Sequence, residues 1–265
     1  MKNILVLVHD DPGQEARIQV ALDIVRAVDG HLICLEVEVM PVLSGDMART
    51  NAIIMADEDE SGSANRARLE PRILAEQLPF SWIEQRGFLS PTIRSIAGPV
   101  DLIVLNRDLD AAGSPDMGCL VAEVLSQSAM PVVAAPEQVR RFDIFGHALV
   151  AWDGSPQAEA ALRAAIPLLR HAGAVSLLEV DDGSLSLPVS EAAAYLARHG
   201  IQARIVRERP LFALPSSLIL KAIGTIQAAY VVMGGFGHSP FVEAAFGGVT
   251  RHLLQSCPVP ILLAR

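Results

Sequence analysis

"HALVAWDGSPQAEAALRAAIPLLRHAGAVSLLEV", residues 147–180, is the second copy of a pattern that appears first as "NILVLVHDDPGQEARIQVALDIVRAVDGHLICLEV", residues 3–37. Each copy runs from an apolar segment through an acidic turn with a proline into a helical pattern. A glycine follows, and then a second apolar segment that ends in Glu-Val. When Pro12 is aligned with Pro156, the Leu-Val pairs of the two first segments also coincide. The chain therefore contains one strand–helix–strand unit twice.

The two copies also end alike. Residues 119–135, "CLVAEVLSQSAMPVVAA", align with residues 248–264, "GVTRHLLQSCPVPILLA". We therefore predict two domains, residues 1–140 and 141–265. The first domain is longer in its middle, and the excess falls on residues 40–71, a polar segment rich in small residues that we expect to be irregular.

Within each domain, strand-like and helix-like patterns alternate. The strand-like segments are "ILVLV" (4–8), "LICLEV" (32–37), "DLIVLN" (101–106), "PVVAA" (131–135), "ALVAW" (148–152), "VSLLEV" (175–180), "ARIV" (203–206), "AYVVMG" (229–234) and "PILLA" (260–264). Continuous apolar runs are typical of parallel strands that are buried on both faces. Strands that alternate with helices form right-handed βαβ units. The sequence thus predicts an α/β fold of two tandem, open, doubly wound parallel-sheet domains of Rossmann-like type.

The composition argues against several classes of function. Of the 265 residues, 51% are hydrophobic and 19% are charged, which allows a full core. The 30 acidic and 21 basic residues give a net charge of −9, which disfavours nucleic acid as a partner because phosphate contacts need a basic face. No apolar run reaches the ~18 residues of a transmembrane helix, so we expect no membrane partner. The first residues read as a β-strand rather than a secretion signal, which predicts a cytoplasmic protein.

The cysteines and histidines give no sign of chemistry. Cys34, Cys119 and Cys257 lie far apart among apolar residues, so we expect them to be buried as small hydrophobic side chains. The seven histidines lack the spacing of metal ligands. No metal site and no catalytic cysteine are predicted.

Glycines cluster twice between residues 231 and 254, in "VVMGGFGHSPFVEAAFGGVTRHLL". The first cluster follows a strand-like run and the second opens a helix-like run, with the spacing G-x2-G-x9-G-G. In doubly wound sheets, ligands bind beyond the carboxyl ends of the strands, where the strand order reverses. Glycine lets a ligand approach the backbone, and the first amides of a helix carry the positive end of its dipole. The pattern predicts a phosphate cradle without a basic side chain; a glycine loop with no ligand is the alternative.

The chain resembles a tandem universal stress protein over nearly its whole length. In the second half, "LVAWDGSPQAEAAL" (149–162) is similar to the family's first strand, acidic turn and helix start. "GGFGHSPFVEAAFGGVTRHLLQSCPVPILL" (234–263) is similar to its phosphate loop, last helix and last strand. The resemblance implies an adenine nucleotide alpha hydrolase-like fold, with the last strands of the two domains paired antiparallel in an internal pseudo-dimer. It also implies an adenine nucleotide as partner, ATP or a related one, with Mg²⁺ as a further candidate.

The resemblance implies binding roles for individual residues. The nucleotide site would comprise Ala151, Asp153, Val180, Gly234, Gly237, His238, Gly247, Gly248, Val249 and Thr250. Asp153 and the backbone of Val180 would contact adenine. The glycines would line the ribose and the phosphates, with an amide from Val249 and with Thr250 close by.

Some of these positions have other interpretations, or depart from the family pattern. Asp153 is alternatively a turn residue before the helix, and His238 is either a phosphate donor or a solvated loop residue. Ala151 stands where many members have proline. Gly248 stands where the binding motif has Ser or Thr, so a hydroxyl donor is lost while the amide remains. A hydrogen bond to a charged group contributes roughly 1.5–3 kcal/mol, so the loss would weaken binding about ten- to a hundredfold.

The first domain lacks the features of the site. His9 stands at the position of Asp153, and the first glycine cluster has no counterpart. Asp108, Asp110 and Asp116 place negative charge where phosphates would sit. We therefore predict that this domain binds no triphosphate and serves to pair with the second domain.

Two functions remain open. The first is a stress-response protein that binds ATP or a related adenine nucleotide through its C-terminal domain. The second is a non-binding scaffold or interaction protein of the same family. An enzyme is disfavoured, beyond slow ATP hydrolysis, because no general base, arginine finger or second carboxylate for magnesium accompanies the glycine motif. Association of two chains into a homodimer fits the family plan, but the sequence does not set the stoichiometry.

Overall fold

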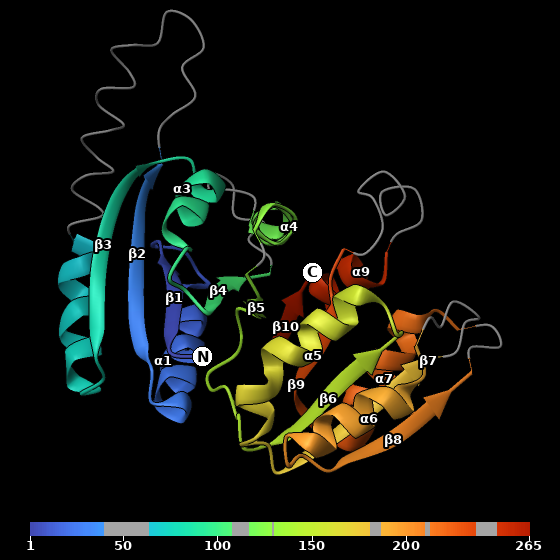
Figure 1. Cartoon of the computed structure of the whole chain (residues 1–265). Helices are drawn as coiled ribbons and strands as arrows, with labels where there is room; N and C mark the ends of the chain where they lie inside the picture. The colour runs from blue at the N-terminus through green and yellow to red at the C-terminus, as the bar shows by residue number, and fades with distance from the viewer. Residues whose placement is uncertain (40–63, 108–116, 129, 181–186, 210–212, 237–247) are drawn as a thin grey trace, which may run out of the picture.

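The computed structural model describes residues 1–39, 64–107, 117–128, 130–180, 187–209, 213–236 and 248–265 (Figure 1). The N-terminal half contains β1 (Asn3–Val8), α1 (Gln14–Val28), β2 (His31–Val39), β3 (Phe80–Gly87), α3 (Leu89–Ile96), β4 (Leu102–Asn106), α4 (Met117–Gln127) and β5 (Val132–Ala135). The C-terminal half contains β6 (His147–Trp152), α5 (Pro156–Leu169), β7 (Ala174–Val180), α6 (Val189–Arg198), β8 (Ala203–Glu208), α7 (Pro215–Ile226), β9 (Ala228–Gly234), α9 (Val249–Ser256) and β10 (Ile261–Ala264).

All of these strands join one ten-stranded sheet in the order β3-β2-β1-β4-β5-β10-β9-β6-β7-β8. Read outward from the centre, each half has the same strand order, and its strands are parallel to one another. The order reverses between β1 and β4 in the first half and between β6 and β9 in the second. The predicted tandem, doubly wound α/β fold is therefore confirmed.

The halves meet at the antiparallel pair β5–β10. Leu262 lies opposite Val133, and every residue of both strands is buried. The predicted pairing of the last strands, and with it the internal pseudo-dimer, is confirmed. The seam removes two apolar edges from solvent, because each covers the other.

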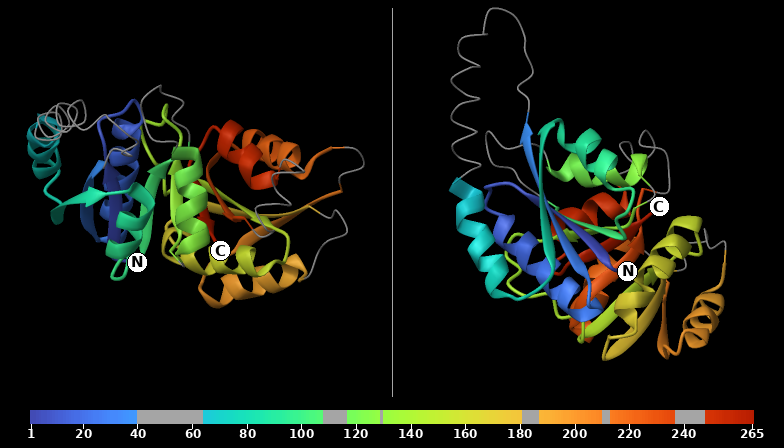
Figure 2. Two further views of the ribbon diagram at one scale, coloured as in Figure 1. Left: turned by 90° about the horizontal axis from the view of Figure 1, so that it is seen from above. Right: turned by 60° about the vertical axis from the view of Figure 1, so that its left-hand side comes forward.

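The sheet is covered by helices on both faces (Figure 2). One face packs against α1, α5, α6 and the helical residues 64–75, and the other face packs against α3, α4, α7 and α9. Each of these two hydrophobic cores contains residues from both halves, so the core is continuous across the β5–β10 seam.

Two parts of the first half differ from expectation. The segment 40–71 was expected to be irregular, and this is wrong from residue 64 onward, where the chain is helical up to residue 75; residues 40–63 lie outside the described residues. β3 has no counterpart among the predicted strands. It is an outer edge strand with partly or fully exposed side chains, so its sequence, "FSWIEQRG", lacks the apolar run of a buried strand.

The start of α5 is capped, and two of the three cysteines have described side chains; the side chain of Cys119 lies outside the described residues. The hydroxyl of Ser155 accepts a hydrogen bond from the amide of Ala158 (3.1 Å), and Pro156 begins α5. Cys34 and Cys257 are buried and unpaired. Burial raises the pKa of the Cys34 thiol to about 12, helped by the charges of nearby glutamates. Within the described part of the chain, no helix has the length and apolar character that crossing a membrane requires.

Candidate functional site

The strand register brings four of the expected site residues to one edge of the sheet. Trp152 pairs with Glu179, so Asp153 and Val180, the next residues, follow neighbouring strand positions. Ala151 lies on β6, next to β9, and Gly234 ends β9. This edge lies where the strand order reverses, at the carboxyl ends of β6, β7 and β9.

Asp153 begins the turn that leads from β6 into α5. Its side chain is exposed, and its Oδ1 accepts a hydrogen bond from the amide of Ser155 (2.9 Å). Gly154 follows with a φ of 72°, in the left-handed region that favours glycine. A side chain at Gly154 would also collide with the backbone of Leu187, whose nitrogen would lie 2.3 Å from the added Cβ. The turn is therefore held by the hydrogen bond between Asp153 and Ser155 and by the backbone of Leu187, which packs against Gly154.

Two buried side chains connect residues 187–189 to strands β6 and β7. The indole Nε1 of Trp152 donates a hydrogen bond to the carbonyl of Leu187 (3.0 Å). Glu179 is 7% exposed, and its carboxylate accepts hydrogen bonds from the amide of Val189 (2.9 Å) and from Nε of Arg207 (3.0 Å). Sequence analysis missed both side chains; the available signal was an acidic residue inside the apolar strand "VSLLEV".

Gly234 lets β9 and α5 come into close contact. A Cβ built there would lie 2.6 Å from the amide nitrogen of Ala158 and 2.8 Å from the carbonyl carbon of Gln157. The end of β9 therefore lies directly against the first turn of α5. Beyond it, the amide of Gly235 donates to the carbonyl of Ala264 (2.9 Å), which extends the pairing of β9 with β10 by one residue.

Helix α9 begins next to this edge of the sheet, and its N-cap residue is a glycine, which has no side chain that could cap the helix. Gly248 is its N-cap residue, and the first helical bond shown runs from the amide of His252 to the carbonyl of Gly248 (3.1 Å). The amides of the first turn have no intrahelical acceptor, and the helix dipole makes this end positive. Val249 is partly buried, whereas Thr250 is 6% exposed and packs inward. Gly237, His238 and Gly247, the other expected site residues, lie outside the described residues.

The sequence profile of the Universal stress protein family matches residues 145–265. Residues 145–265 therefore form a universal stress protein domain. The structure of a universal stress protein from Archaeoglobus fulgidus DSM 4304 is similar over 99% of this chain and 98% of that one, with a TM-score of 0.76 and 19% identity. A functionally unknown protein from Pseudomonas aeruginosa PAO1 is similar over 100% of this chain and 92% of that one, with a TM-score of 0.64 and 18% identity. A search of curated proteins found no match.

Both solved structures span the two halves, so the tandem universal stress protein fold extends over the whole chain. At 18–19% identity, these similarities establish the fold and leave the ligand of each half open. The two halves differ in the side chains at the point where their strand order reverses.

In the N-terminal half, a fully buried arginine connects the carboxyl ends of β1 and β4. Nε of Arg17 donates to the carbonyl of Leu7 (2.6 Å), and Nη1 donates to the side-chain oxygen of Asn106 at the end of β4. Nη2 donates to Oδ2 of Asp11 (2.9 Å) and to the carbonyl of His9 (3.1 Å). The guanidinium thus occupies the point at which the strand order of this half reverses.

Asp11 supplies the countercharge. Its side chain is fully buried, and Oδ1 also accepts a hydrogen bond from the amide of Gly13 (2.8 Å) at the start of α1. Burial alone would raise the pKa of Asp11. The contact with His9 and the charge of Arg17 outweigh this effect, so the pKa of Asp11 lies below its ordinary value. The pair is therefore an internal salt bridge that needs no ligand.

The universal stress protein domain of the second half has small residues at these positions. In the alignment of the two copies, Ala161 corresponds to Arg17, and the strand pairing places Gly234 where Asn106 stands. In the first half a glycine on the helix side, Gly13, receives the side chain of Asn106, at 2.6 Å from an added Cβ. In the second half the glycine is on the strand instead. In each half, a glycine thus lets the end of one strand, β4 or β9, pack closely against the start of one helix, α1 or α5. In the first half, the buried ion pair of Asp11 and Arg17 lies beside this contact.

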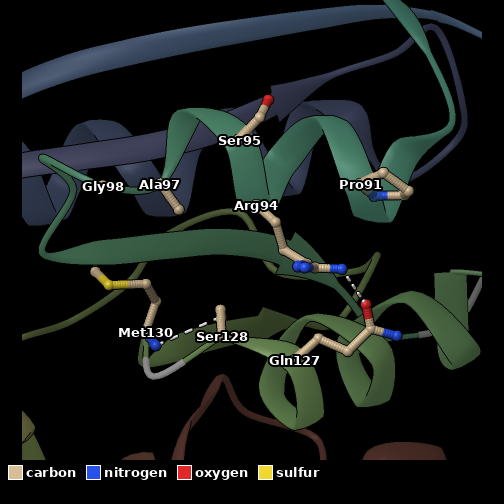
Figure 3. A pocket seen from close by; sticks show the side chains of 8 residues that line it. All are labelled: Pro91, Arg94, Ser95, Ala97, Gly98, Gln127, Ser128 and Met130. Carbon is tan, nitrogen blue, oxygen red and sulfur yellow. Dashed lines mark hydrogen bonds between the residues drawn. The ribbon is translucent and has the colours of Figure 1, made fainter.

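A cavity of about 470 Å³ opens elsewhere, between α3 and α4 of the N-terminal half (Figure 3). It is lined by Pro91, Arg94, Ser95, Ala97, Gly98, Gln127, Ser128 and Met130. Its arginine, Arg94, already donates a hydrogen bond to Gln127 (2.7 Å). None of the expected site residues lines this cavity. Within the described residues, no group of three or more potential metal ligands is found either.

Proposed function

We propose that the C-terminal half binds an adenine nucleotide, ATP or a related one, at the carboxyl ends of β6 and β9. The observation that carries the proposal is the start of α9, where the N-cap residue, Gly248, has no side chain that could cap the first amides of the helix. An uncapped positive helix end is a favourable partner for a phosphate group. The site lies at the reversal of strand order, in the half that matches the universal stress protein family.

In this proposal the nucleotide lies across three neighbouring strands. Adenine contacts Asp153 and the backbone of Val180, and the ribose lies toward Gly234. The phosphates face the amides of Gly248 and Val249, with or without Mg²⁺. Gly237, His238, Gly247, Ala151 and Thr250 complete the proposed site. The exposure of Asp153 supports its role, because a ligand can reach it.

We infer that the N-terminal half binds no triphosphate. Arg17 and Asn106 are in contact at the point where the strand order of this half reverses, and the cation of Arg17 is already neutralised by Asp11. A nucleotide would have to displace a buried ion pair. The expected stoichiometry is therefore one nucleotide per chain.

We further propose a role in the stress response that rests on binding rather than catalysis, with hydrolysis of ATP at most slow. The cytoplasmic location and a homodimer of the whole chain stay predictions from the sequence. The alternative, a family member that binds no nucleotide, is favoured by one observation. Oδ1 of Asp153 already caps its own turn at Ser155, as a residue with a purely structural role would.

Calorimetric titration of the nucleotide-stripped protein with Mg-ATP tests the proposal. The same titration of Gly248→Ser tests the role of the start of α9. The added hydroxyl supplies a donor at the start of α9, so binding should tighten about ten- to a hundredfold, the equivalent of roughly 1.5–3 kcal/mol. The matched control is Gly98→Ser, because an added side chain there meets no atom within 4 Å.

The wild type should bind one Mg-ATP per chain, and Gly98→Ser should bind as the wild type does. Heat from Gly248→Ser alone would favour the alternative, a cradle that keeps its shape without a physiological nucleotide. Absence of heat from both proteins up to millimolar ATP would overturn the proposal.

A further inference from the structure

Helix α9 is anchored at its C-terminal end by the other half of the molecule. Arg107 follows β4 in the N-terminal half, and its Nη1 lies 3.5 Å from the carbonyl oxygen of Leu253 in the last turn of α9. That carbonyl also accepts the amide of Cys257 (2.8 Å), which closes the helix. Burial raises the pKa of the Cys257 thiol, and the nearby charge of Arg107 opposes that rise. The cation is therefore placed at the negative end of the α9 dipole, where it is stabilising.

The start of the glycine segment also contacts the N-terminal half. A Cβ built on Gly235 would lie 3.5 Å from Cδ1 of Leu125 on α4 and 3.3 Å from Cδ2 of Leu263 on β10. Leu125 is buried. The described residues at both ends of the glycine motif, Gly235 near its start and α9 after its last glycine, thus contact the first half.

The two contacts are related by the internal symmetry. The amide of Arg107 donates to the carbonyl of Ala135 (3.3 Å), as the amide of Gly235 donates to that of Ala264 (2.9 Å). Arg107 and Gly235 therefore occupy equivalent positions, each one residue beyond its strand and beside the last helix of the opposite half. The glycine lets α4 approach closely, whereas the arginine reaches across the seam to α9.

We propose that Arg107 is a positioning residue through which the N-terminal half holds the phosphate-binding end of α9 in place. This inference rests on the proposed nucleotide site. α9 has eight residues and is about 12 Å long, so a tilt of its C-terminal turn moves the amides of Gly248 and Val249 at the other end. The first half thus contributes to the site of the second without touching the ligand.

The test compares two ligands and three variants of the full chain. Arg107→Met keeps the length of the side chain and removes its charge, Arg107→Lys restores a cation, and Arg94→Met is the control. Arg94 is also in the N-terminal half; it lies on α3 and donates to Gln127 of α4, so its contact stays within that half. Each protein is titrated with Mg-ATP and with adenosine, which has no phosphate to meet α9.

Arg107→Met should weaken the binding of Mg-ATP about three- to tenfold and leave that of adenosine unchanged. This range converts to roughly 0.7–1.4 kcal/mol, which is within the ~2 kcal/mol that a cation contributes at most to a partly buried helix C-terminus. Arg107→Lys should recover at least half of the loss on a logarithmic scale, and Arg94→Met should bind as the wild type does. Unchanged ATP affinity in Arg107→Met, or an equal loss for both ligands, would overturn the inference.

Hydrogen exchange of the α9 amides separates this inference from the nucleotide site itself. If the wild type binds neither ligand, the proposed function fails, and the anchoring of α9 is then judged without ligand. Exchange along residues 249–256 should be faster in Arg107→Met than in the wild type and unchanged in Arg94→Met. Equal exchange in Arg107→Met and the wild type would show that Arg107 does not hold the helix.

Discussion

Asp11 and Arg17 form an ion pair from which water is excluded, so the N-terminal half depends on both charges. Replacing Asp11 with Asn leaves the Arg17 cation buried without its countercharge. Removing one partner of such a pair costs about 3–5 kcal/mol. We expect Asp11→Asn to lower the free energy of unfolding by about this amount at neutral pH, measured by urea denaturation.

The same pair makes this difference depend on pH. The pKa of Asp11 is lower in the folded protein than its ordinary value, so its contribution is complete above the unfolded pKa of about 3.9 and is lost as the pH falls through the folded pKa. The stability gap between wild type and Asp11→Asn should therefore shrink in acid. Asp10→Asn is the control, because Asp10 is exposed and its salt bridge with Arg68 contributes at most about 1 kcal/mol. A gap below about 1 kcal/mol at neutral pH would contradict the account.

Residue by residue, the sequence predicted some parts of the site and missed others. Asp153 and Gly234 could be placed because they follow apolar runs that end at the same edge of the sheet. The burial of Arg17 could not be predicted, because a lone arginine in a helical pattern is usually on the solvent face. Its partner Asn106 is distant in the sequence, and its partner Asp11 has the pattern of a turn residue. The role of Glu179 could not be predicted for a similar reason. Its carboxylate oxygens accept hydrogen bonds from residues of α6 and β8, which come close to it only in the folded chain.

At the level of elements, the packing of β9 on α5 depends on a missing side chain. A Cβ at Gly234 would lie 2.6 Å from the backbone nitrogen of Ala158, so Gly234→Ala must push the first turn of α5 away from β9. Overpacking of this kind costs about 1–3 kcal/mol. We expect a loss of this size in thermal or urea unfolding. Gly98→Ala, with open space around it, should change stability little, and an equally small change in Gly234→Ala would show that α5 adjusts freely.

Elements were predictable from sequence where both faces of a strand are buried. β1, β6 and β9 are continuous apolar runs because helices cover them on both sides. β3 was missed because it lies at the outer edge, where side chains such as Glu84 and Arg86 make ion pairs with neighbouring elements. The helical start at residue 64 was missed because its stabilising contacts are tertiary. Asn65 exchanges hydrogen bonds with Gln14 of α1 across 2.9 and 3.0 Å.

For the whole molecule, the β5–β10 seam sets how the chain can assemble. β10 is buried along its length, and Leu262 lies at its centre, opposite Val133. Because the halves have the same strand order, the edge that β5 offers to β10 resembles the edge that a second β10 would offer. A fragment of residues 141–265 would expose this apolar edge, which is a template for pairing with another chain.

We therefore expect the fragment 141–265 to form a two-fold symmetric homodimer through β10, measured by light scattering after size-exclusion chromatography. Such an interface is self-complementary, as a two-fold axis requires. Leu262→Lys should convert the dimer into monomer or unfolded chain, because it places two like charges at the centre of the pair. Ala203→Lys, on the outer edge strand β8, should leave the dimer intact. A folded, monomeric fragment would mean that β10 does not need a partner strand, and that the first half is held to the second mainly by helix contacts such as those of Leu125 and Arg107.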